Sequence, residues 1–303
     1  MTALSSGPDE ASASASLWRL AEIYHALVYY APERAEHYGK LGLKGGWMAY
    51  FATRSGALGE VPPAVVTACF YNFKHAMVER ALPDAWRYTT PEQACAARLA
   101  VFDEAVRRLL GDEVDSVAVA EAADLACEGV GGLPVHGRPL FAAHVSLPRP
   151  TAPHEVLFWA TAAMREYRGD GHTMALATAG VDGCEAHVLM AGMGLVPPDQ
   201  RRFRGWSEDD WDGAATRLRE RGWLDGDAQV TDRGRRERGR IEGMTDRLSH
   251  PLLDRLGADR ARRLADLLTP LAAGIVTAGG VPYPNGMGAP PAPELSTMPS
   301  TPP

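Results

Sequence analysis

The sequence predicts a mainly α-helical fold made of two related winged-helix-like halves, with a clear wing only in the C-terminal half. Three observations lead to this prediction. Apolar residues recur at helical spacing through most of the chain. A helix, a short strand and a long helix, separated by turns, follow one another after residue 206. Two segments of the first half also resemble two segments of the second, and internal repeats of this kind indicate a tandem duplication.

The first half is predicted to be a succession of helices. Residues 17–30 carry leucine, isoleucine, tyrosine and valine at the spacing of an amphipathic helix. A second helix begins at the prolines of 61–63 and ends at Pro83, and a third covers 90–110. Proline is favoured in the first turn of a helix and disfavoured in its interior, so these prolines mark helix ends.

Glycine and proline interrupt the helical spacing in the middle of the chain. The segments GVGGLPVHGRPLF, near 129–141, and PRPTAP, at 148–153, favour turns over helix. We therefore expect a domain boundary here. The predicted parts are a disordered tail at 1–16, an N-terminal domain at 17–145, a C-terminal winged-helix domain at 154–280 and a Pro-rich disordered tail at 281–303.

The second half is predicted to contain the wing. A helix covers 154–168, the glycines of GDG at 169–171 break it, and another helix follows. Ser207 and Asp210 resemble a capping box, which begins a helix with an acidic first turn. The segment RLRERGWLDGDAQVTDRGRRERGRIE then contains a turn, a short strand and the start of a long helix that ends near Leu248. This order is typical of a winged helix.

The repeat consists of two pairs of segments. Residues 90–112 align with 207–227, and residues 37–61 align with 166–188. A duplicated unit with a degenerate first wing would explain both pairs. Chance similarity between alanine-rich helices is the alternative.

Composition restricts the class of protein. Apolar residues make up 46% and charged residues 23% of the chain, which is ordinary for a globular protein. The formal net charge is −7, so the chain does not have the excess of basic residues that is typical of nucleic-acid-binding proteins. The four cysteines form no CxxC pair, so we expect them to be reduced and mostly buried. No signal peptide or membrane span is predicted, which indicates a cytoplasmic protein with no membrane partner. The oligomeric state stays open, a homodimer included.

Several short segments together resemble a known family. They are YYAPE (29–33), VVTACFYNF (65–73), LFAAH (140–144), REYRGDGH (165–172) and IEGMTDRL (241–248). On these segments the chain resembles the actinobacterial SalK-like family of helix-turn-helix proteins of unknown function. The resemblance covers nearly all of 17–280. It implies a helix-turn-helix fold and a connection with specialised metabolism, and it assigns no activity.

The segment REYRGDGH is the predicted catalytic cluster. If the glycines bend the chain, Asp170 and His172 point into one cleft, where Asp170 orients His172 as a general acid and base. Arg165 would hold an anionic group of the ligand. Glu166 and Arg168 belong to the same cluster as predicted ligand contacts. The alternative is a structural loop in which Asp170 caps the following helix.

Three further polar residues interrupt apolar helices and are predicted ligand contacts. Tyr71 and Asn72 interrupt the helix after residue 61, and His25 lies on the apolar face of the first helix. A satisfied core position is the alternative for each. The nine histidines show no metal-ligand spacing, and no nucleotide or cofactor motif is present, so we expect neither a metal nor a cofactor.

Charge along the winged helix argues against DNA binding by the usual geometry. The helix after Ser207 begins with acidic residues, which would meet the phosphates of a major groove. Arginines follow the wing, at 233–240, and offer a basic patch that glutamates dilute. The sequence therefore favours a protein that binds a small, anionic organic ligand between its halves, with cofactor-independent acid–base catalysis as a further hypothesis. A ligand-responsive transcription regulator that binds DNA is the alternative.

Overall fold

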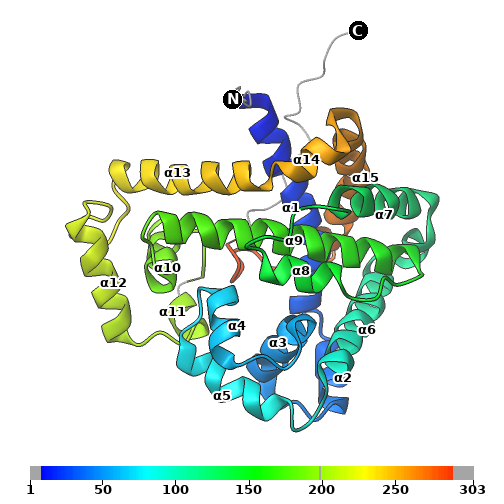
Figure 1. Cartoon of the computed structure of the whole chain (residues 1–303), viewed down its shortest axis with the longest axis horizontal. Helices are drawn as coiled ribbons and strands as arrows, with labels where there is room; N and C mark the ends of the chain where they lie inside the picture. The colour runs from blue at the N-terminus through cyan, green and yellow to red at the C-terminus, as the bar shows by residue number, and fades with distance from the viewer. Residues whose placement is uncertain (1–7, 198, 289–303) are drawn as a thin grey trace.

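The computed structural model describes residues 8–197 and 199–288, and within them every regular element is a helix (Figure 1). The first helices are α1 (Pro8–Tyr30), α2 (Arg34–Lys40), α3 (Gly45–Ser55), the 3-10 helix η1 (Gly56–Leu58), α4 (Pro63–Phe70) and α5 (His75–Ala85). The chain continues with α6 (Pro91–Leu110), the 3-10 helix η2 (Gly111–Asp115), α7 (Val117–Val130), α8 (Pro139–Val145) and α9 (Pro153–Thr178). The last helices are α10 (Gly183–Gly192), α11 (Gln200–Phe203), α12 (Glu208–Glu220), α13 (Asp232–Ser249), α14 (Pro251–Leu256) and α15 (Ala258–Thr277).

Helix α9 crosses the centre of the molecule (Figure 1). It packs against α1, α7, α8 and α13, while α1 packs in turn against α15 near the other end of the described chain. Helices α2 to α6 lie on one side of α9, and α10 to α12 gather near one of its ends (Figure 1). None of the described helices is long and apolar enough to cross a membrane. The predicted helical fold is confirmed.

The helices enclose two hydrophobic cores. The larger core joins α1, α3, α6, α7, the first part of α9 and α15. The smaller core joins the end of α9 with α10, α12 and α13, and with Leu224 and Val230 between the last two. Because the larger core takes residues from both predicted domains, the division at 145–154 does not coincide with a division between cores.

The predicted break at 169–171 is wrong, because α9 runs through it without interruption. A β-carbon at Gly171 would lie 3.2 Å from a guanidinium nitrogen of Arg138 and 3.3 Å from the β-carbon of Leu248. Glycine at this position therefore permits a close approach of neighbouring elements to the helix. The helical hydrogen bonds and the packing of α9 outweigh the modest helix propensity cost of two glycines.

Both predicted tails are partly folded. Helix α1 begins at Pro8, and not at Leu17, since proline suits a first helical turn and the alanines that follow favour helix. At the other end, Val281 and Asn285 are buried, and Gln200 donates a hydrogen bond of 2.9 Å to the carbonyl oxygen of Gly286. The prediction that proline excludes this whole segment from the core is therefore wrong for 281–288. The rest of both predicted tails, 1–7 and 289–303, lies outside the described residues.

The predicted helix from 61 to 83 is two helices. The chain leaves α4 at Tyr71, a residue with a positive φ of 56°, and α5 begins four residues later. Pro83 lies inside α5 and does not end it. Pro83 lies in the last turn of α5, where its missing N–H removes one intrahelical hydrogen bond close to the helix end and leaves the preceding turns intact.

The segment between α12 and α13 turns back on itself without forming a full strand pair. Leu224 and Val230 make an isolated antiparallel bridge, and Thr231 donates a backbone hydrogen bond of 3.0 Å to Trp223. The predicted strand is thus reduced to one bridging pair. After α6, which the predicted repeat aligns with α12, the chain forms the 3-10 helix η2.

Candidate functional site

A cavity of about 280 Å3 lies among α3, α6, α8 and α9. Most of its wall is apolar and includes Leu99, Leu147 and Trp159. The rim contains the exposed residues Glu92 and Pro148. Ligand sites in proteins are typically apolar cavities of this kind, with a few polar groups that fix the orientation of the ligand.

Two polar groups, Arg98 from α6 and His144 from α8, lie on the inner wall of the cavity. Arg98 is 5% exposed and His144 is 3% exposed. The two Nη atoms of Arg98 donate to His144 Nε2 over 3.2 Å, to His25 Nε2 over 2.7 Å and to the Tyr29 hydroxyl over 3.0 Å. Its Nε–H has no hydrogen-bond partner among the described residues.

The two histidines that contact Arg98 are uncharged at neutral pH. Burial, reinforced by the charge of Arg98, lowers the pKa of His25 well below its usual value. Burial also lowers the pKa of His144 to about 4. The Nδ1–H of His144 faces the carbonyl oxygen of Leu140 at 2.9 Å, which leaves Nε2 as the acceptor for Arg98. The side chains that accept hydrogen bonds from Arg98 are thus neutral.

A cluster of buried charges adjoins this site. Arg54 donates two hydrogen bonds to the carboxylate of Glu166, over 3.1 and 3.0 Å, and Arg165 donates a third over 2.7 Å. Burial by itself would raise the pKa of Glu166, but Arg165 and Arg54 outweigh it and hold that pKa well below its usual value. Burial raises the pKa of Glu22, 3.8 Å from Arg165, to about 7.

Three of the predicted site residues belong to this polar interior. They are His25, which contacts Arg98, and Arg165 and Glu166, which form the ion pairs beside Arg54. Helix α1 supplies the first residue and α9 the other two, so the tertiary structure brings together residues that lie far apart in the sequence.

Asp170 and His172 do not converge. Asp170 faces α8, where its carboxylate accepts the Phe141 N–H over 2.9 Å, and burial raises its pKa to about 7. His172 faces α13, where its Nδ1 lies 2.9 Å from the Thr245 hydroxyl, and burial lowers its pKa to about 4. Side chains two residues apart on a continuous helix point to different faces of that helix. Asp170 therefore caps a helix, as the alternative held, but the helix is α8 and not the one expected.

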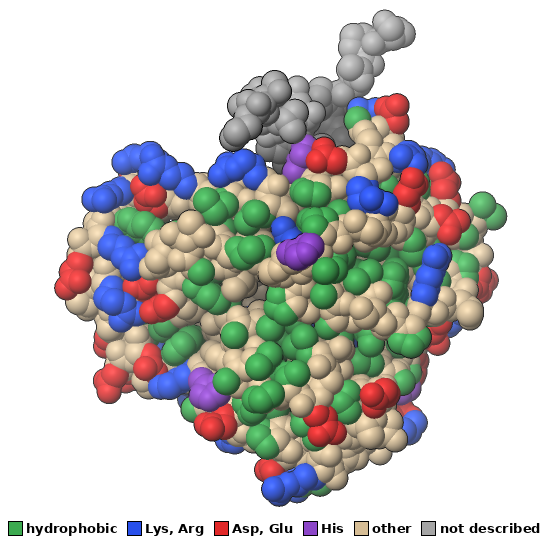
Figure 2. All heavy atoms as spheres, in the orientation of Figure 1, with side chains coloured by type: hydrophobic (Ala, Val, Ile, Leu, Met, Phe, Trp, Pro, Cys, Tyr) green, Lys and Arg blue, Asp and Glu red, His purple; other side chains and the backbone are tan. Residues whose placement is uncertain are grey.

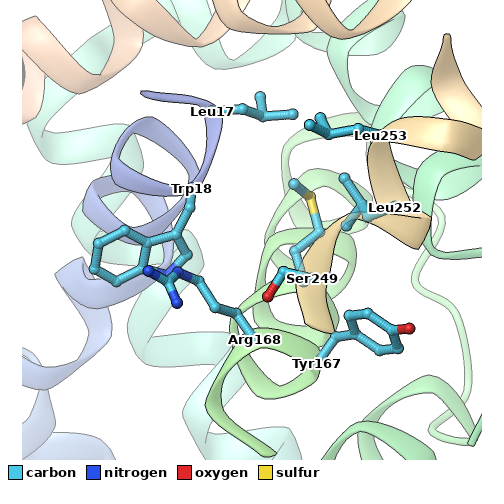
Figure 3. Close-up of a pocket in the computed structure, with 8 residues that line it drawn as sticks. Leu17, Trp18, Tyr167, Arg168, Ser249, Leu252 and Leu253 are labelled. Carbon is cyan, nitrogen blue, oxygen red and sulfur yellow. The ribbon is translucent and has the colours of Figure 1, made fainter. Parts of the chain in front are cut away.

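Arg168 is also separate from the cavity. It pairs with Glu242 and Asp246 on α13, and its guanidinium lies 4.5 Å from the centre of the Trp18 ring. Figure 3 shows Trp18 and Arg168 side by side at a small pocket that Tyr167 and Leu252 also line. That pocket has a volume of only about 20 Å3, enough for a single water.

Tyr71 and Asn72 lie at the junction of the two cores and do not line the cavity. The Tyr71 hydroxyl donates to the carbonyl oxygen of Val181 over 2.6 Å, and the Trp206 indole donates to the carbonyl oxygen of Asn72 over 3.1 Å. A β-carbon at Gly183 would lie 2.1 Å from the carbonyl oxygen of Tyr71, so only glycine permits this contact.

Sequence reasoning missed Arg98, Arg54 and Glu22. A signal for Arg98 was present, because it follows Ala94 and precedes Val101 on the apolar stripe of its helix. A charge at such a position requires a partner from another part of the chain. The sequence shows the position but not the partner.

One group of side chains has the composition of a metal site. Ligand atoms of Asp103, His154 and Glu155 lie within 4.8 Å of one another. Asp103 Oδ1 already contacts His154 Nε2 at 2.7 Å and accepts a hydrogen bond of 2.8 Å from Arg107. The arginine opposes a cation at this place, so the group is better explained as an ion-pair network.

The four cysteines are free, as predicted, but only Cys184 is buried. Cys69, Cys95 and Cys127 are half-buried, and Cys95 lies on the wall of the cavity. Burial raises the pKa of the Cys95 thiol, so it is not a reactive thiolate at neutral pH.

The Helix-turn-helix family matches residues 14–282, which is most of the chain, and the protein belongs to this family. Among curated proteins and solved structures, none matches the chain. A helix-turn-helix fold is compatible with DNA binding, and membership of the family by itself assigns no ligand and no reaction.

Proposed function

We propose that this member of the helix-turn-helix family binds a small organic ligand in the cavity among α3, α6, α8 and α9. The observation that carries the proposal is the cavity itself, about 280 Å3 in volume, with an apolar wall and the buried polar pair Arg98 and His144. A volume just below the range of drug-sized sites fits a compact ligand.

The distribution of buried and exposed residues along the cavity wall supports entry of a ligand from solvent. Thr53, Phe158 and Ala162 are buried lining residues, whereas Glu92 and Ala96 are exposed. The cavity therefore has an inner wall and an outer rim. A ligand would bury its apolar part among the aromatic and aliphatic side chains and direct a polar group to the inner wall.

A cavity-filling substitution tests this proposal. Ala162→Phe adds a ring at a lining position of α9, and Ala177→Leu, an exposed position of the same helix, is the matched control. We expect ligand-observed NMR with a library of small aromatic and aliphatic compounds to detect binders that the wild type and Ala177→Leu share and that Ala162→Phe loses. Binders that Ala162→Phe retains would contradict the proposal.

Acid–base catalysis stays a separate hypothesis. His172, Asp170 and Arg165 do not meet at the cavity, and His172 and Asp170 each hold neighbouring helices. If the predicted catalysis exists, His172→Ala and Asp170→Asn abolish turnover while the melting temperature stays nearly unchanged. If the residues are structural, both variants lower the melting temperature, and any effect on ligand affinity follows that loss.

A ligand-responsive DNA-binding regulator is the second candidate function. The specific observation in its favour is a row of exposed arginines at the start of α13, which includes Arg233, Arg235 and Arg236 (Figure 2). No carboxylate pairs with these three within the described part of the chain. We infer a winged helix from α10 to α13, in which the bridge of Leu224 and Val230 is the remnant of a wing.

The start of α12 opposes the usual mode of DNA recognition. Asp210 accepts from Lys74 and also caps the helix with Ser207, so the end that would enter a groove is acidic and packed against another part of the chain. Fluorescence anisotropy with DNA from the upstream region, against a scrambled duplex across a salt series, tests the second candidate. Tight, sequence-dependent binding that Arg235→Ala and Arg236→Ala weaken would establish the regulator.

Membership of the SalK-like family and the tandem duplication also stay proposals. We infer that the chain is a SalK-like protein with a tandem duplication, on the sequence segments given above. A ligand from specialised metabolism would be consistent with the proposed cavity.

A further inference from the structure

We propose that the ligand of this cavity is a small apolar carboxylic acid, bound as a monoanion with its carboxylate on Arg98. This inference rests on the proposed function and names the class of ligand. It starts from the side chains around one buried guanidinium group.

Arg98 is a buried cation for which the fold supplies no anion. Its hydrogen-bond partners are two histidines and a tyrosine, and no carboxylate lies within ion-pair distance of it among the described residues. Its Nε–H is also left without a protein acceptor. A buried charge is expensive unless it is paired, so a charged ligand group at this place would complete the arrangement.

Two other buried arginines also lack a carboxylate partner among the described residues, but both bond to backbone carbonyl oxygens. Arg138 donates to the carbonyl oxygens of Tyr167 and Leu248, and Arg204 donates to that of Gly286 and to His187 Nε2. A carbonyl dipole therefore stabilises each of these charges, whereas the hydrogen-bond partners of Arg98 are side chains. Neither arginine lines the cavity, whereas Arg98 does.

The N–H groups that Arg98 has left specify the kind of acceptor. The two histidines and the tyrosine accept from three of its five N–H groups, so the Nε–H and one Nη1–H remain. A carboxylate accepts hydrogen bonds from such groups and also supplies the opposite charge, which makes these hydrogen bonds charge-assisted. The buried acidic side chains Glu166 and Glu22 already face Arg54 and Arg165. A carboxylate from outside is then the group that fits Arg98.

The remaining wall sets the rest of the ligand. Phe158, whose ring lies 5.7 Å from the Arg98 guanidinium carbon, and Trp159 provide aromatic surface for an apolar body. Glu92 is the one acidic residue among those that line the cavity, and it is exposed at the rim. A second negative charge on the ligand would face Glu92, so a monoanion is favoured over a dianion.

The cavity contains a native reporter, because Cys95 lines it and Cys127, equally half-buried, does not. Burial raises the pKa of both thiols, so the experiment is run above neutral pH, where a larger fraction of each is ionised. We would measure the rate at which methyl methanethiosulfonate modifies each cysteine of the full chain by mass spectrometry of its peptides. The probes are benzoate, 2-naphthoate and octanoate, each compared with its own amide. Acid and amide differ in charge but hardly in shape, so the comparison isolates the carboxylate.

We expect the best acid to protect Cys95, with no effect on Cys127, at a concentration about 10-fold or more below that of its amide, since a charged hydrogen bond is stronger than a neutral one. If an amide protects Cys95 as well as its acid does, recognition does not depend on a carboxylate, and this inference fails while the proposed function still holds. Acids that fail to protect Cys95 up to about 1 mM, the weak end of ligand affinity, would also overturn the inference.

A substitution gives the second readout. Arg98→Met removes the charge and keeps much of the side-chain volume, and Arg107→Met makes the same change at an exposed site of the same helix. We expect Arg98→Met to weaken the acid about 30-fold or more and to leave the amide nearly unchanged, while Arg107→Met changes neither. An equal loss for acid and amide would mean that Arg98 shapes the cavity without binding the carboxylate.

Discussion

Arg54 and Arg98 are buried guanidinium groups of one protein interior, and their surroundings differ. Arg54 binds the carboxylate of Glu166 through two hydrogen bonds, with Arg165 on the same carboxylate. Arg98 binds two histidines and a tyrosine, which are neutral, and lies on the wall of the cavity. The fold therefore provides an anion for one cation and none for the other.

The difference separates a charge that maintains the fold from a charge that is available to a ligand. Removing one partner of a buried ion pair leaves the other charge unpaired, which is strongly destabilising. Removing a buried cation that has no anion carries no such penalty, although its hydrogen bonds are lost. Stability measurements can therefore distinguish the two arginines without knowledge of the ligand.

The largest effect is expected where the ion pairs share one carboxylate. Glu166→Gln leaves Arg54 and Arg165 buried without that anion, and we expect a loss of about 3–5 kcal/mol in the free energy of unfolding. Urea titration measures it, with the exposed Glu104→Gln as a control. A loss below about 1 kcal/mol would mean that the pairs contribute little, as surface pairs do.

Glu22 provides a pH-dependent test of the same cluster. Its pKa in the folded protein, about 7, lies above the ordinary value of 4.5, so folding favours the protonated form. The stabilisation by this group is complete below about pH 4.5 and is lost as the pH rises through 7. Between these limits we expect the wild type to lose on the order of 3 kcal/mol relative to Glu22→Gln.

Denaturant titrations of wild type and Glu22→Gln at a series of pH values measure this difference. Asp170 has a pKa raised in the same direction, so both proteins retain that contribution and it cancels in the comparison. Parallel curves for the two proteins would show that Glu22 is ionised in the fold throughout.

A smaller effect is expected at Arg98. In the absence of ligand, Arg98→Met should lower the free energy of unfolding by about 1–2 kcal/mol, because hydrogen bonds to His25, His144 and Tyr29 are lost while no carboxylate is left unpaired. Urea titration beside Glu166→Gln tests the contrast directly. A loss as large as that of Glu166→Gln would indicate that an anion of the protein compensates Arg98 after all.

The smallest effect is expected at the half-exposed pair between the two cores. Lys74 lowers the pKa of Asp210 to about 2, but their side chains are 34% and 31% exposed and solvent screens the pair. Lys74→Met should therefore cost less than about 1 kcal/mol. Thermal unfolding of this variant should keep a single transition; two separate transitions would show that this contact holds the cores together.

By itself, the sequence determined the helical class and several helix ends. Thr90 with Gln93, and Ser207 with Asp210, form capping boxes because a hydroxyl and a carboxyl or amide group three residues apart satisfy local backbone N–H groups. Such interactions depend on neighbours in the chain, and the predicted starts at 90 and 207 were therefore right.

The tertiary structure decided the course of α9 and the location of the site. The glycines of 169–171 stay helical because α8 and α13 pack closely against that helix, and this separates Asp170 from His172. Arg98 lies on α6, and its hydrogen-bond partners come from α1 and α8. A buried charge can be recognised from its place on an apolar stripe, but which side chains surround it depends on the packing of distant helices.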